Sequence, residues 1–398
     1  MLFMLGHDRS ALVHAVCRTR ELQLPDFTDA RREPMRAPRP HGMDFAQQFD
    51  ATTLLYDALD LGDGEAVLLA PPLFNLADEI AATTFTGDGE ICRADIKTYD
   101  RHAQIWLTGI RANAVQARGP IGDITIPLSP SHSEMFRDRR VIFTISKDNP
   151  VAWILDWVRF NRDIHGADAV LIYDNGSAAY DGATLSQALQ SIRGIACSVV
   201  VEWPYPRGAQ GTNSRDHADV CRLGAWEHAR WCFLQHARSA MNSDVNELVL
   251  SQDGRSVFEA AERSHYGFVR YRGRWIIGVD GPDADPGDRL PRHRDFSILM
   301  PPDYRWSWRR GRRDLSRCLP KWTVVPARCP RDVQWHVHSV ASWLPSYLPC
   351  SRNFSFSRFG EIGSDWKSQR TNRVAFDPAV HITNDLLVKT LARVDWSA

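Results

Sequence analysis

The stretch Arg140-Val-Ile-Phe-Thr-Ile-Ser-Lys-Asp-Asn-Pro150 decides the fold, because it joins a buried strand to the start of a helix. Its first seven residues are an apolar run of strand length, and Asp148-Asn149-Pro150 predicts a helix start with a capping side chain. A helical apolar stripe follows, made by Trp153, Ile154, Trp157, Val158 and Phe160. Ala169-Val-Leu-Ile-Tyr173 predicts the next strand. Strand, helix and strand form a βαβ unit, which implies a parallel sheet.

The same alternation continues toward the C-terminus. The pattern predicts a helix over residues 184–192, a strand over 197–203, a long helix over 216–240 and a strand over 248–250. Further on it predicts a hairpin over 267–272 and 274–278, strands over 321–325 and 333–338, and a closing helix over 383–394. The predicted fold class is therefore α/β, with a doubly wound sheet.

Residues 1–138 differ from this pattern and are predicted to form an N-terminal β-rich domain, followed by an α/β domain over 139–398. A Pro- and Arg-rich linker is expected at about residues 22–43. Short apolar runs at 66–70, 103–107 and 121–128 read as strands separated by turn signals. The role of this domain stays open between simple packing and an accessory, carbohydrate-contacting module.

Composition limits the classes of partner. The chain has 398 residues, of which 43% are hydrophobic and 24% charged, as in ordinary globular proteins. Lys and Arg total 48, as do Asp and Glu, so no net charge favours nucleic acid. No apolar run approaches the ~18 residues of a membrane span. The eight scattered cysteines include no C-x-x-C pair, so reduced thiols in the cytoplasm are expected.

An acidic patch, Asp244-Val-Asn-Glu247, precedes the apolar run Leu248-Val-Leu250. Asp244 and Asn246 are two residues apart, so in an extended segment their oxygen atoms face the same side. Mg²⁺ and Mn²⁺ prefer such oxygen ligands and often share them with substrate phosphates. An ordinary polar turn is the alternative interpretation. The patch predicts a divalent metal that holds a nucleotide diphosphate.

A second candidate is the turn Tyr173-Asp-Asn-Gly-Ser177 at the end of a predicted strand. In open α/β sheets ligands bind at the carboxyl ends of strands. Asp174 and Asn175 are therefore predicted to bind the nucleotide, and Thr144 and Ser146 to line the same crevice. The four residues after Tyr173 also make a good plain turn, and that reading stays open.

Three other groups carry weaker signals. His336 and His338 alternate along a predicted strand, and His338 is a candidate metal ligand, with a structural histidine as the commoner alternative. Lys367 and Arg370 are three residues apart on an expected helix, where they can clamp a diphosphate or simply be surface charges. The segment Tyr304–Arg313 mixes aromatic and basic residues, which indicates a local anion-binding loop, a solvated face or nucleic-acid binding.

The order of these segments resembles bacterial glycosyltransferases of the GT-A type, especially those related to glycosyltransferase family 92 and to the family 2-like capsular polysaccharide transferases. The likeness covers residues 139–395. It is carried by the segments Phe143–Pro150, Trp153–Trp157, Tyr173–Ser177, Glu227–Trp231 and Asp244–Leu248, and by the later segments at Lys321-Trp322 and Trp366–Arg370.

The resemblance implies a Rossmann-like GT-A domain that transfers a sugar from a nucleotide-sugar, expected to be a UDP-sugar, to a glycan or lipid-linked acceptor. It implies that Asp174 contacts the nucleoside, and that Asp244 and Asn246 face Mn²⁺ or Mg²⁺ and the diphosphate. An inverting enzyme also needs a base to accept the acceptor's proton. Glu361 and Asp365 lie near the expected site, and the sequence does not choose between them.

Two departures from the family pattern matter. Asn246 stands where the pattern has Asp, and Arg358 stands where relatives carry His, so that its charge can replace that of a metal. These changes leave a second reading open, a non-catalytic relative that binds a glycan or a nucleotide. Polysaccharide biosynthesis in the cytoplasm is expected, without nucleic acid or a transmembrane segment, and with peripheral contact to the inner membrane face as an open alternative.

Overall fold

The computed structural model describes residues 12–26, 30–34, 45–208, 219–280, 289–307, 311–363 and 374–397. The chain divides into two compact units. Unit 1 comprises Met1–Cys17, Phe136–Val201 and His236–Ala398, and unit 2 comprises Arg18–Met135 and Glu202–Gln235. Residues 202–235, which the sequence pattern places in the C-terminal domain, thus belong with the N-terminal residues. Trp203 explains this in part, because its ring packs against that of Tyr56, 4.9 Å away.

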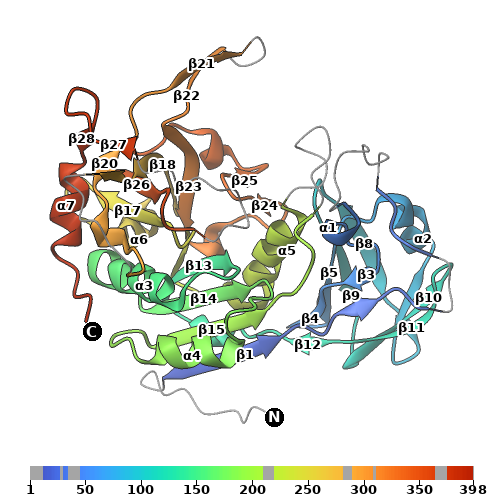
Figure 1. Ribbon diagram of the computed structural model, residues 1–398. Helices are drawn as coiled ribbons and strands as arrows, with labels where there is room; N and C mark the ends of the chain where they lie inside the picture. The colour runs from blue at the N-terminus through green and yellow to red at the C-terminus, as the bar shows by residue number, and fades with distance from the viewer. Residues whose placement is uncertain are drawn as a thin grey trace. The chain divides into compact units, whose positions relative to one another are not determined.

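Unit 1 is a mixed α/β structure built on one large sheet (Figure 1). The strand order is β1-β15-β14-β13-β16-β23-β18-β20-β28, and β26 pairs with both β17 and β18. The strands are β1 (Val13–Arg18), β13 (Arg140–Ser146), β14 (Ala169–Asp174), β15 (Cys197–Glu202), β16 (Ser239–Asn242), β17 (Glu247–Ser251), β18 (Phe268–Ile277), β20 (Ile298–Leu299), β23 (Arg317–Val324), β26 (Phe354–Phe359) and β28 (Ile382–Thr383).

The predicted βαβ unit is confirmed. Strands β13 and β14 pair in parallel, with Ser146 opposite Asp174, and helix α3 (Val151–His165) connects them. The apolar stripe of α3 is buried against the sheet in one hydrophobic core. Gly166 ends the helix in the left-handed conformation that glycine adopts without steric cost. The predicted side-chain cap is wrong, because Pro150 is the N-cap residue and makes no side-chain hydrogen bond.

The sheet reverses its direction of winding beside β13. From β13 the chain moves outward to β14 and then β15, whereas β16 returns to the other side of β13 and pairs with it in parallel. Ligand crevices of open α/β sheets form at such a switch point, outside the carboxyl ends of the strands. Here those ends are Ser146 of β13 and Asn242 of β16, and the acidic patch begins two residues after Asn242.

The predicted helix over residues 216–240 extends too far at its C-terminal end. Residues 216–218 lie outside the described part of the chain, and helix α5 (Val220–His228) continues only into a π-helical turn, η3 (Ala229–Phe233). Strand β16 then begins at Ser239. Its four residues are too few to show a strand period, and their pairing with β13 and β23 overrides local propensity.

The hairpin predicted at residues 267–278 is a single strand, β18, whose register with β23 shifts between Tyr271 and Gly273. Gly273 does not turn the chain, but it leaves room for the Phe356 ring of β26, which a Cβ atom would strike. The strand predicted at 333–338 shortens to β24 (Gln334–Trp335), which pairs with β25 (Val340–Ala341). The strand predicted at 321–325 is part of β23, and is therefore confirmed.

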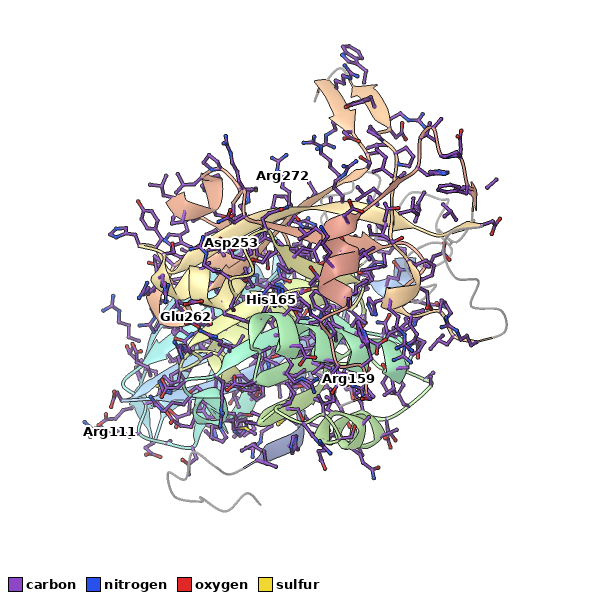
Figure 2. The ribbon with its side chains drawn as sticks, turned by 90° about the vertical axis from the view of Figure 1, so that its left-hand side faces the viewer. Arg111, Arg159, His165, Asp253, Glu262 and Arg272 are labelled. Atoms are coloured by element: carbon purple, nitrogen blue, oxygen red, sulfur yellow. The ribbon has the colours of Figure 1, made fainter. Side chains whose placement is uncertain are left out.

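Helices cover the large sheet and fix its strands. Glu262, at the end of helix α6 (Val257–Arg263), accepts hydrogen bonds from Arg140 Nη2 at 2.8 Å and from Ser239 Oγ at 2.8 Å (Figure 2). It thereby ties β13 to β16.

The remaining elements of unit 1 are α4 (Gly182–Gln190), α7 (Asp385–Leu391), β19 (Val279–Asp280), β21 (Tyr304–Ser307), β22 (Gly311–Asp314), β27 (Val374–Ala375), η4 (His293–Asp295), η5 (Pro326–Arg328) and η6 (Leu344–Tyr347), with η2 (Ser133–Phe136) at the boundary of the two units.

Unit 2 is β-rich, and the predicted strands at 66–70, 103–107 and 121–128 are present in it as β5, β9 and β11. Its sheets have the orders β12-β4-β5-β9-β8, β11-β10-β6-β7 and β2-β3. The elements are β2 (Leu22–Gln23), α1 (Phe45–Gln48), β3 (Thr53–Leu55), β4 (Asp57–Gly62), β5 (Glu65–Ala70), η1 (Phe74–Leu76), α2 (Ala77–Ala81), β6 (Thr84–Gly87), β7 (Glu90–Ile91), β8 (Arg93–Thr98), β9 (Ala103–Thr108), β10 (Ala114–Gly119), β11 (Gly122–Pro127) and β12 (Ser129–Pro130).

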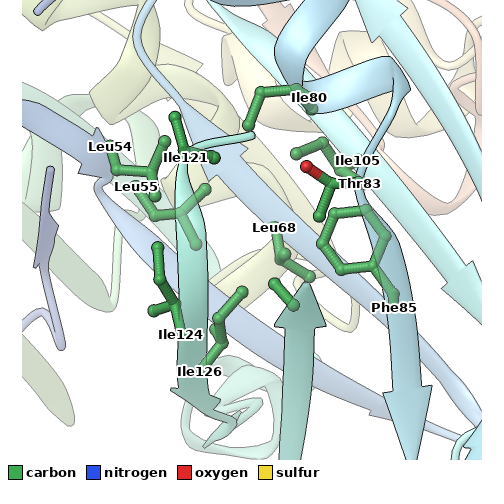
Figure 3. A pocket seen from close by; sticks show the side chains of 11 residues that line it. Leu54, Leu55, Leu68, Ile80, Thr83, Phe85, Ile105, Ile121, Ile124 and Ile126 are labelled. Atoms are coloured by element: carbon green, nitrogen blue, oxygen red, sulfur yellow. The ribbon is translucent and has the colours of Figure 1, made fainter. Parts of the chain in front are cut away.

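Unit 2 has its own hydrophobic core, with a small cavity between its sheets (Figure 3). Isoleucine, leucine and phenylalanine side chains line the cavity, and Thr83 is its polar residue. Its volume of about 10 Å³ is the space of roughly one water molecule. The cavity is therefore a packing defect and too small for a sugar.

Two global features concern membranes and thiols. In the part of the chain that the structure describes, no helix combines the length and apolar character that crossing a membrane requires. All eight cysteines lie within the described residues, and all are free thiols.

Candidate functional site

The acidic patch is a tight turn between β16 and β17. The Glu247 backbone N–H donates to the Asp244 carbonyl oxygen at 2.9 Å, and the Asp244 N–H donates to Glu247 Oε2 at 3.0 Å. The Trp157 indole of α3 reaches the same turn through Ser243 Oγ, at 3.3 Å. Both carboxylates are buried. The turn is therefore fixed in shape and holds two negative charges away from water.

Two buried histidines brace this turn and the strand that follows it. The His293 Nε2–H donates to the Val245 carbonyl oxygen at 2.9 Å, and the His165 Nε2–H donates to that of Val249 at 2.8 Å. His165 Nδ1 accepts the Val257 N–H at 3.3 Å, so both of its bonds need the neutral ring. Burial lowers the pKa of each histidine to about 4. The braces are therefore uncharged at neutral pH.

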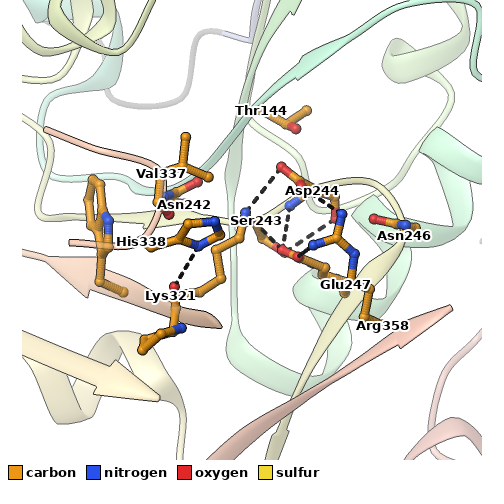
Figure 4. A network of polar contacts seen from close by, with 12 residues as sticks. Thr144, Asn242, Ser243, Asp244, Asn246, Glu247, Lys321, Val337, His338 and Arg358 are labelled. Atoms are coloured by element: carbon orange, nitrogen blue, oxygen red, sulfur yellow. Dashed lines mark hydrogen bonds and ion pairs between the residues drawn. The ribbon is translucent and has the colours of Figure 1, made fainter. Parts of the chain in front are cut away.

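Lys321 of β23 supplies the first positive charge. Because β23 pairs antiparallel with β16, with Trp322 opposite Asn242, Lys321 comes beside the acidic turn. Its Nζ lies 2.9 Å from Glu247 Oε2 and 3.1 Å from Asp244 Oδ1 (Figure 4). The Lys321 side chain is 1% exposed. A buried ammonium is retained only when carboxylates compensate it, and here there are two.

Arg358 of β26 supplies the second positive charge. It stands directly opposite Glu247 in the β17–β26 pair. Its Nη1 lies 3.3 Å from Glu247 Oε1, and its Nη2 lies 3.9 Å from Asp244 Oδ2. The guanidinium carbon lies 4.8 Å from the ring centroid of Trp275, which supports it from one side. Asp244, Glu247, Lys321 and Arg358 thus form one cluster with balanced charges, which we call the charge cluster.

The charged groups of the charge cluster lie close together, but the angles between several of them are poor for hydrogen bonds. Although opposite charges lie within 3.3 Å of them, Lys321 Nζ and Glu247 Oε1 make no hydrogen bond of good geometry with any described residue. We regard the contacts as charge–charge attraction, because the distances are short while the angles fail. An ammonium has three N–H donors. Lys321 therefore keeps hydrogen-bonding capacity inside the site.

The turn after β14 lies at the same edge of the sheet. Asp174 Oδ1 accepts the Ser177 hydroxyl at 2.5 Å, and Asp174 Oδ2 accepts the Ser177 N–H at 3.2 Å. The Asn175 N–H donates to the Ser146 carbonyl oxygen at 2.8 Å. Gly176 has φ +70°, which favours glycine. Asp174 and Asn175 are buried and shape the turn itself, so the structural reading of this motif gains support.

Figure 4 also shows Thr144, which was predicted to line the crevice. Thr144 lies beside Asp244 at the carboxyl end of β13, and Ser146 accepts the Asn149 side-chain amide at 2.8 Å. The Glu361 side chain packs against Gly278, where an added Cβ atom would lie 3.0 Å from its Cγ atom. Asp365, Lys367 and Arg370 lie outside the described residues.

The side chains predicted to bind a metal are not gathered around one point. Asn246 donates its amide to the Phe359 carbonyl oxygen at 3.3 Å, and His338 Nδ1 donates to that of Pro320 at 3.0 Å. These two residues lie on opposite sides of Asp244 (Figure 4). The described residues contain no group of three or more His, Cys, Asp or Glu that can hold a metal. Lys321 Nζ occupies the position beside Asp244 where a cation is expected.

The sequence reading did not assign roles to Lys321 and Glu247. One signal was present, because Lys321 interrupts a strand whose neighbours Trp322, Thr323 and Val324 are all buried. A lysine inside such a run requires a buried carboxylate partner. The identity of that partner was not readable, since 74 residues separate Glu247 from Lys321.

Comparisons with known proteins add no assignment, since no protein-family model and no curated protein matches the chain.

Proposed function

We propose that unit 1 transfers a sugar from a nucleotide-sugar donor to a glycan or lipid-linked acceptor. The observation that carries this proposal is the charge cluster next to the switch point of the sheet, where Asp244 follows the carboxyl end of β16 and Lys321 comes from the adjacent strand β23. Sites for nucleotides with diphosphate groups occur at this position in open α/β sheets. The GT-A resemblance of the sequence points to the same residues.

In this proposal the cluster meets the diphosphate, and the turn at Asp174 borders the nucleoside. Lys321 and Arg358 donate hydrogen bonds to phosphate oxygens, since the Lys321 ammonium has unused donors in the structure. Asp244 and Glu247 keep both cations in place. The acceptor oxygen bonds to the anomeric carbon of the sugar, the bond from that carbon to the diphosphate breaks, and the acceptor's proton passes to a base. Glu361 and Asp365 remain the predicted candidates for that base.

A second candidate function is binding of the nucleotide or a glycan without transfer. The balance of charges favours it, because two carboxylates and two cations leave the cluster without a net positive charge to stabilise a diphosphate as it departs from the sugar. Lys367 and Arg370 are also predicted to bind the diphosphate. If they do, the diphosphate of a nucleotide-sugar would meet their two positive charges in addition to the neutral cluster.

The experiment that tests the proposal is release of UDP from a panel of UDP-sugars by the purified protein. The Asp244→Asn variant keeps the shape of the side chain but unbalances the cluster, and we expect turnover to fall by about 100-fold or more. Asp253→Asn is the matched control, because Asp253 is an exposed carboxylate outside the cluster (Figure 2). UDP that binds without any sugar release would support the non-catalytic candidate. Equal turnover of Asp244→Asn and the control would remove the charge cluster from the reaction.

A further inference from the structure

The β21–β22 hairpin is a separate structure within unit 1. The two strands pair only with each other and take no part in the large sheet. Figure 1 shows the hairpin extending beyond the strands of that sheet. A two-stranded ribbon is only marginally stable by itself in water. Its residues Tyr304, Arg305, Trp306, Arg312 and Arg313 are all exposed.

One face of the hairpin combines aromatic rings with a guanidinium group. Tyr304 and Trp306 alternate with Arg305 along β21, and Arg312 of β22 is directly opposite Trp306. The Arg312 guanidinium carbon lies 3.9 Å from the centroid of the Tyr304 ring. Trp306 is 62% exposed and Tyr304 is 53% exposed. Large aromatic side chains with this exposure, next to a cation, mark a contact surface.

The other face places two like charges together. Arg305 and Arg313 are directly opposite each other in the ribbon. Like charges at directly opposed positions destabilise a strand pair unless an anion lies between them. Arg305 is paired with Asp303, at 3.1 Å. Neither Arg313 nor Arg312 has a carboxylate within ion-pair distance among the described residues. The hairpin thus holds positive charge that no carboxylate among the described residues neutralises.

We propose that this hairpin docks on the surface of an anionic lipid bilayer. Tyrosine and tryptophan are the residues that settle at the boundary between headgroups and acyl chains. Arginines nearby attract anionic headgroups and act within a short distance of the surface. A ribbon exposed on both faces can lie in the headgroup layer with Trp306 toward the chains and Arg313 toward phosphates. A nucleic acid would use the same arginines, but it would not bury the tryptophan in hydrocarbon.

The hairpin is also joined to the candidate site. Strand β23 begins at Arg317, three residues after the hairpin ends at Asp314, and carries Lys321. A bilayer under the hairpin would bring a lipid-linked acceptor to the unit that holds the charge cluster. The docking proposal does not depend on the proposed function, because binding to vesicles is measured on the full chain without any sugar donor.

Sedimentation with vesicles tests the docking. The wild-type protein should bind vesicles of phosphatidylcholine mixed with phosphatidylglycerol, and bind phosphatidylcholine vesicles much more weakly. The variant Arg312→Gln/Arg313→Gln should bind the anionic vesicles about 25-fold more weakly, from about fivefold for each arginine. The control Arg352→Gln/Arg393→Gln removes the same charge at two exposed arginines outside the hairpin and should bind as the wild type does.

A second measurement distinguishes a bilayer from other anions. Brominated acyl chains should quench part of the tryptophan emission of the bound protein, and Trp306→Phe should remove that part. Circular dichroism confirms that each variant is folded. The proposal is overturned if the hairpin variant binds anionic vesicles as well as the control does, or if Trp306→Phe leaves the quenching unchanged. Tighter binding to a single-stranded oligonucleotide than to anionic vesicles, lost in the hairpin variant, would assign the hairpin to nucleic acid instead.

Discussion

Lys321 Nζ lies 2.9 Å from Glu247 Oε2, and each of the two side chains is only 1% exposed. This pair joins strand β23 to the acidic turn after β16, at the place where the sheet reverses its winding. A buried ion pair of this kind contributes little to stability beyond what apolar side chains would give, but removing one partner is costly. The pair therefore makes a direct prediction about folding, separate from any activity.

Lys321→Met should destabilise the protein by about 3 kcal/mol, because Asp244 and Glu247 would then share only the charge of Arg358. The double variant Lys321→Met/Glu247→Gln restores the charge balance and should recover most of that loss. Urea unfolding of the wild type, both single variants and the double variant measures the coupling between the two residues. A double variant less stable than Lys321→Met would show that the two charges do not compensate each other.

Stability should fall in acid because of the buried histidines. Burial holds the pKa of His165 and His293 at about 4 in the folded protein, against the ordinary 6.5. Between these two pKa values the unfolded chain binds more protons than the folded chain, so the free energy of unfolding rises with pH. The contribution of the neutral histidines to stability is therefore lost as the pH falls from 6.5 to 4. The loss is at most ~3 kcal/mol for each histidine.

The variant His293→Gln isolates one of these contributions. The glutamine amide can still donate to the Val245 carbonyl oxygen but does not titrate in this range. We expect its free energy of unfolding to depend less steeply on pH than that of the wild type. His265→Gln, at an exposed histidine, is the matched control. Identical slopes for His293→Gln and wild type would mean that His293 is charged in the folded state.

Chelation should not reduce turnover of a nucleotide-sugar. Lys321 Nζ, 3.1 Å from Asp244 Oδ1, already places a positive charge where the sequence pattern predicts a metal. UDP release should therefore be the same in EDTA as in Mn²⁺. An absolute requirement for Mn²⁺ would restore the predicted metal and would mean that the charge cluster rearranges around it.

Gly273→Ala should destabilise unit 1 by about 2 kcal/mol, since the new methyl group would overlap the Phe356 ring and force β18 away from β26. Gly363→Ala is the matched control, because a Cβ atom there meets nothing within 4 Å. Thermal unfolding of the two variants checks the packing of these strands. Equal stability would show that β26 does not approach β18 as closely as described.

Local patterns in the sequence were sufficient for the first half of unit 1. The apolar run of β13, the stripe of α3 and the run of β14 are each continuous in sequence, and each element forms where the pattern predicts it. The turn at Asp174 was also placed correctly at the end of a strand. Hydrophobic periodicity is informative for such segments because burial and period coincide.

The candidate site depended on contacts that local patterns do not contain. Strand β16 has only four residues, and its identity comes from β13 on one side and β23 on the other. Lys321 and Arg358 reach Glu247 across 74 and 111 residues of sequence. The family resemblance predicts that the charge of Arg358 can replace that of a metal. The ion pairs of Arg358 with Glu247 and Asp244 agree with this prediction. The equivalent role of Lys321 emerges only from the register of β23.

The central claim is that the charge cluster binds the diphosphate of a nucleotide, and calorimetry with UDP tests it most directly. The variant Lys321→Met/Glu247→Gln removes the buried ammonium together with its partner's charge, so the fold is expected to survive. If Lys321 donates to the diphosphate, the variant should bind UDP about tenfold more weakly or worse, as expected for the loss of charged hydrogen bonds. Unchanged affinity for UDP in a folded variant would contradict the account.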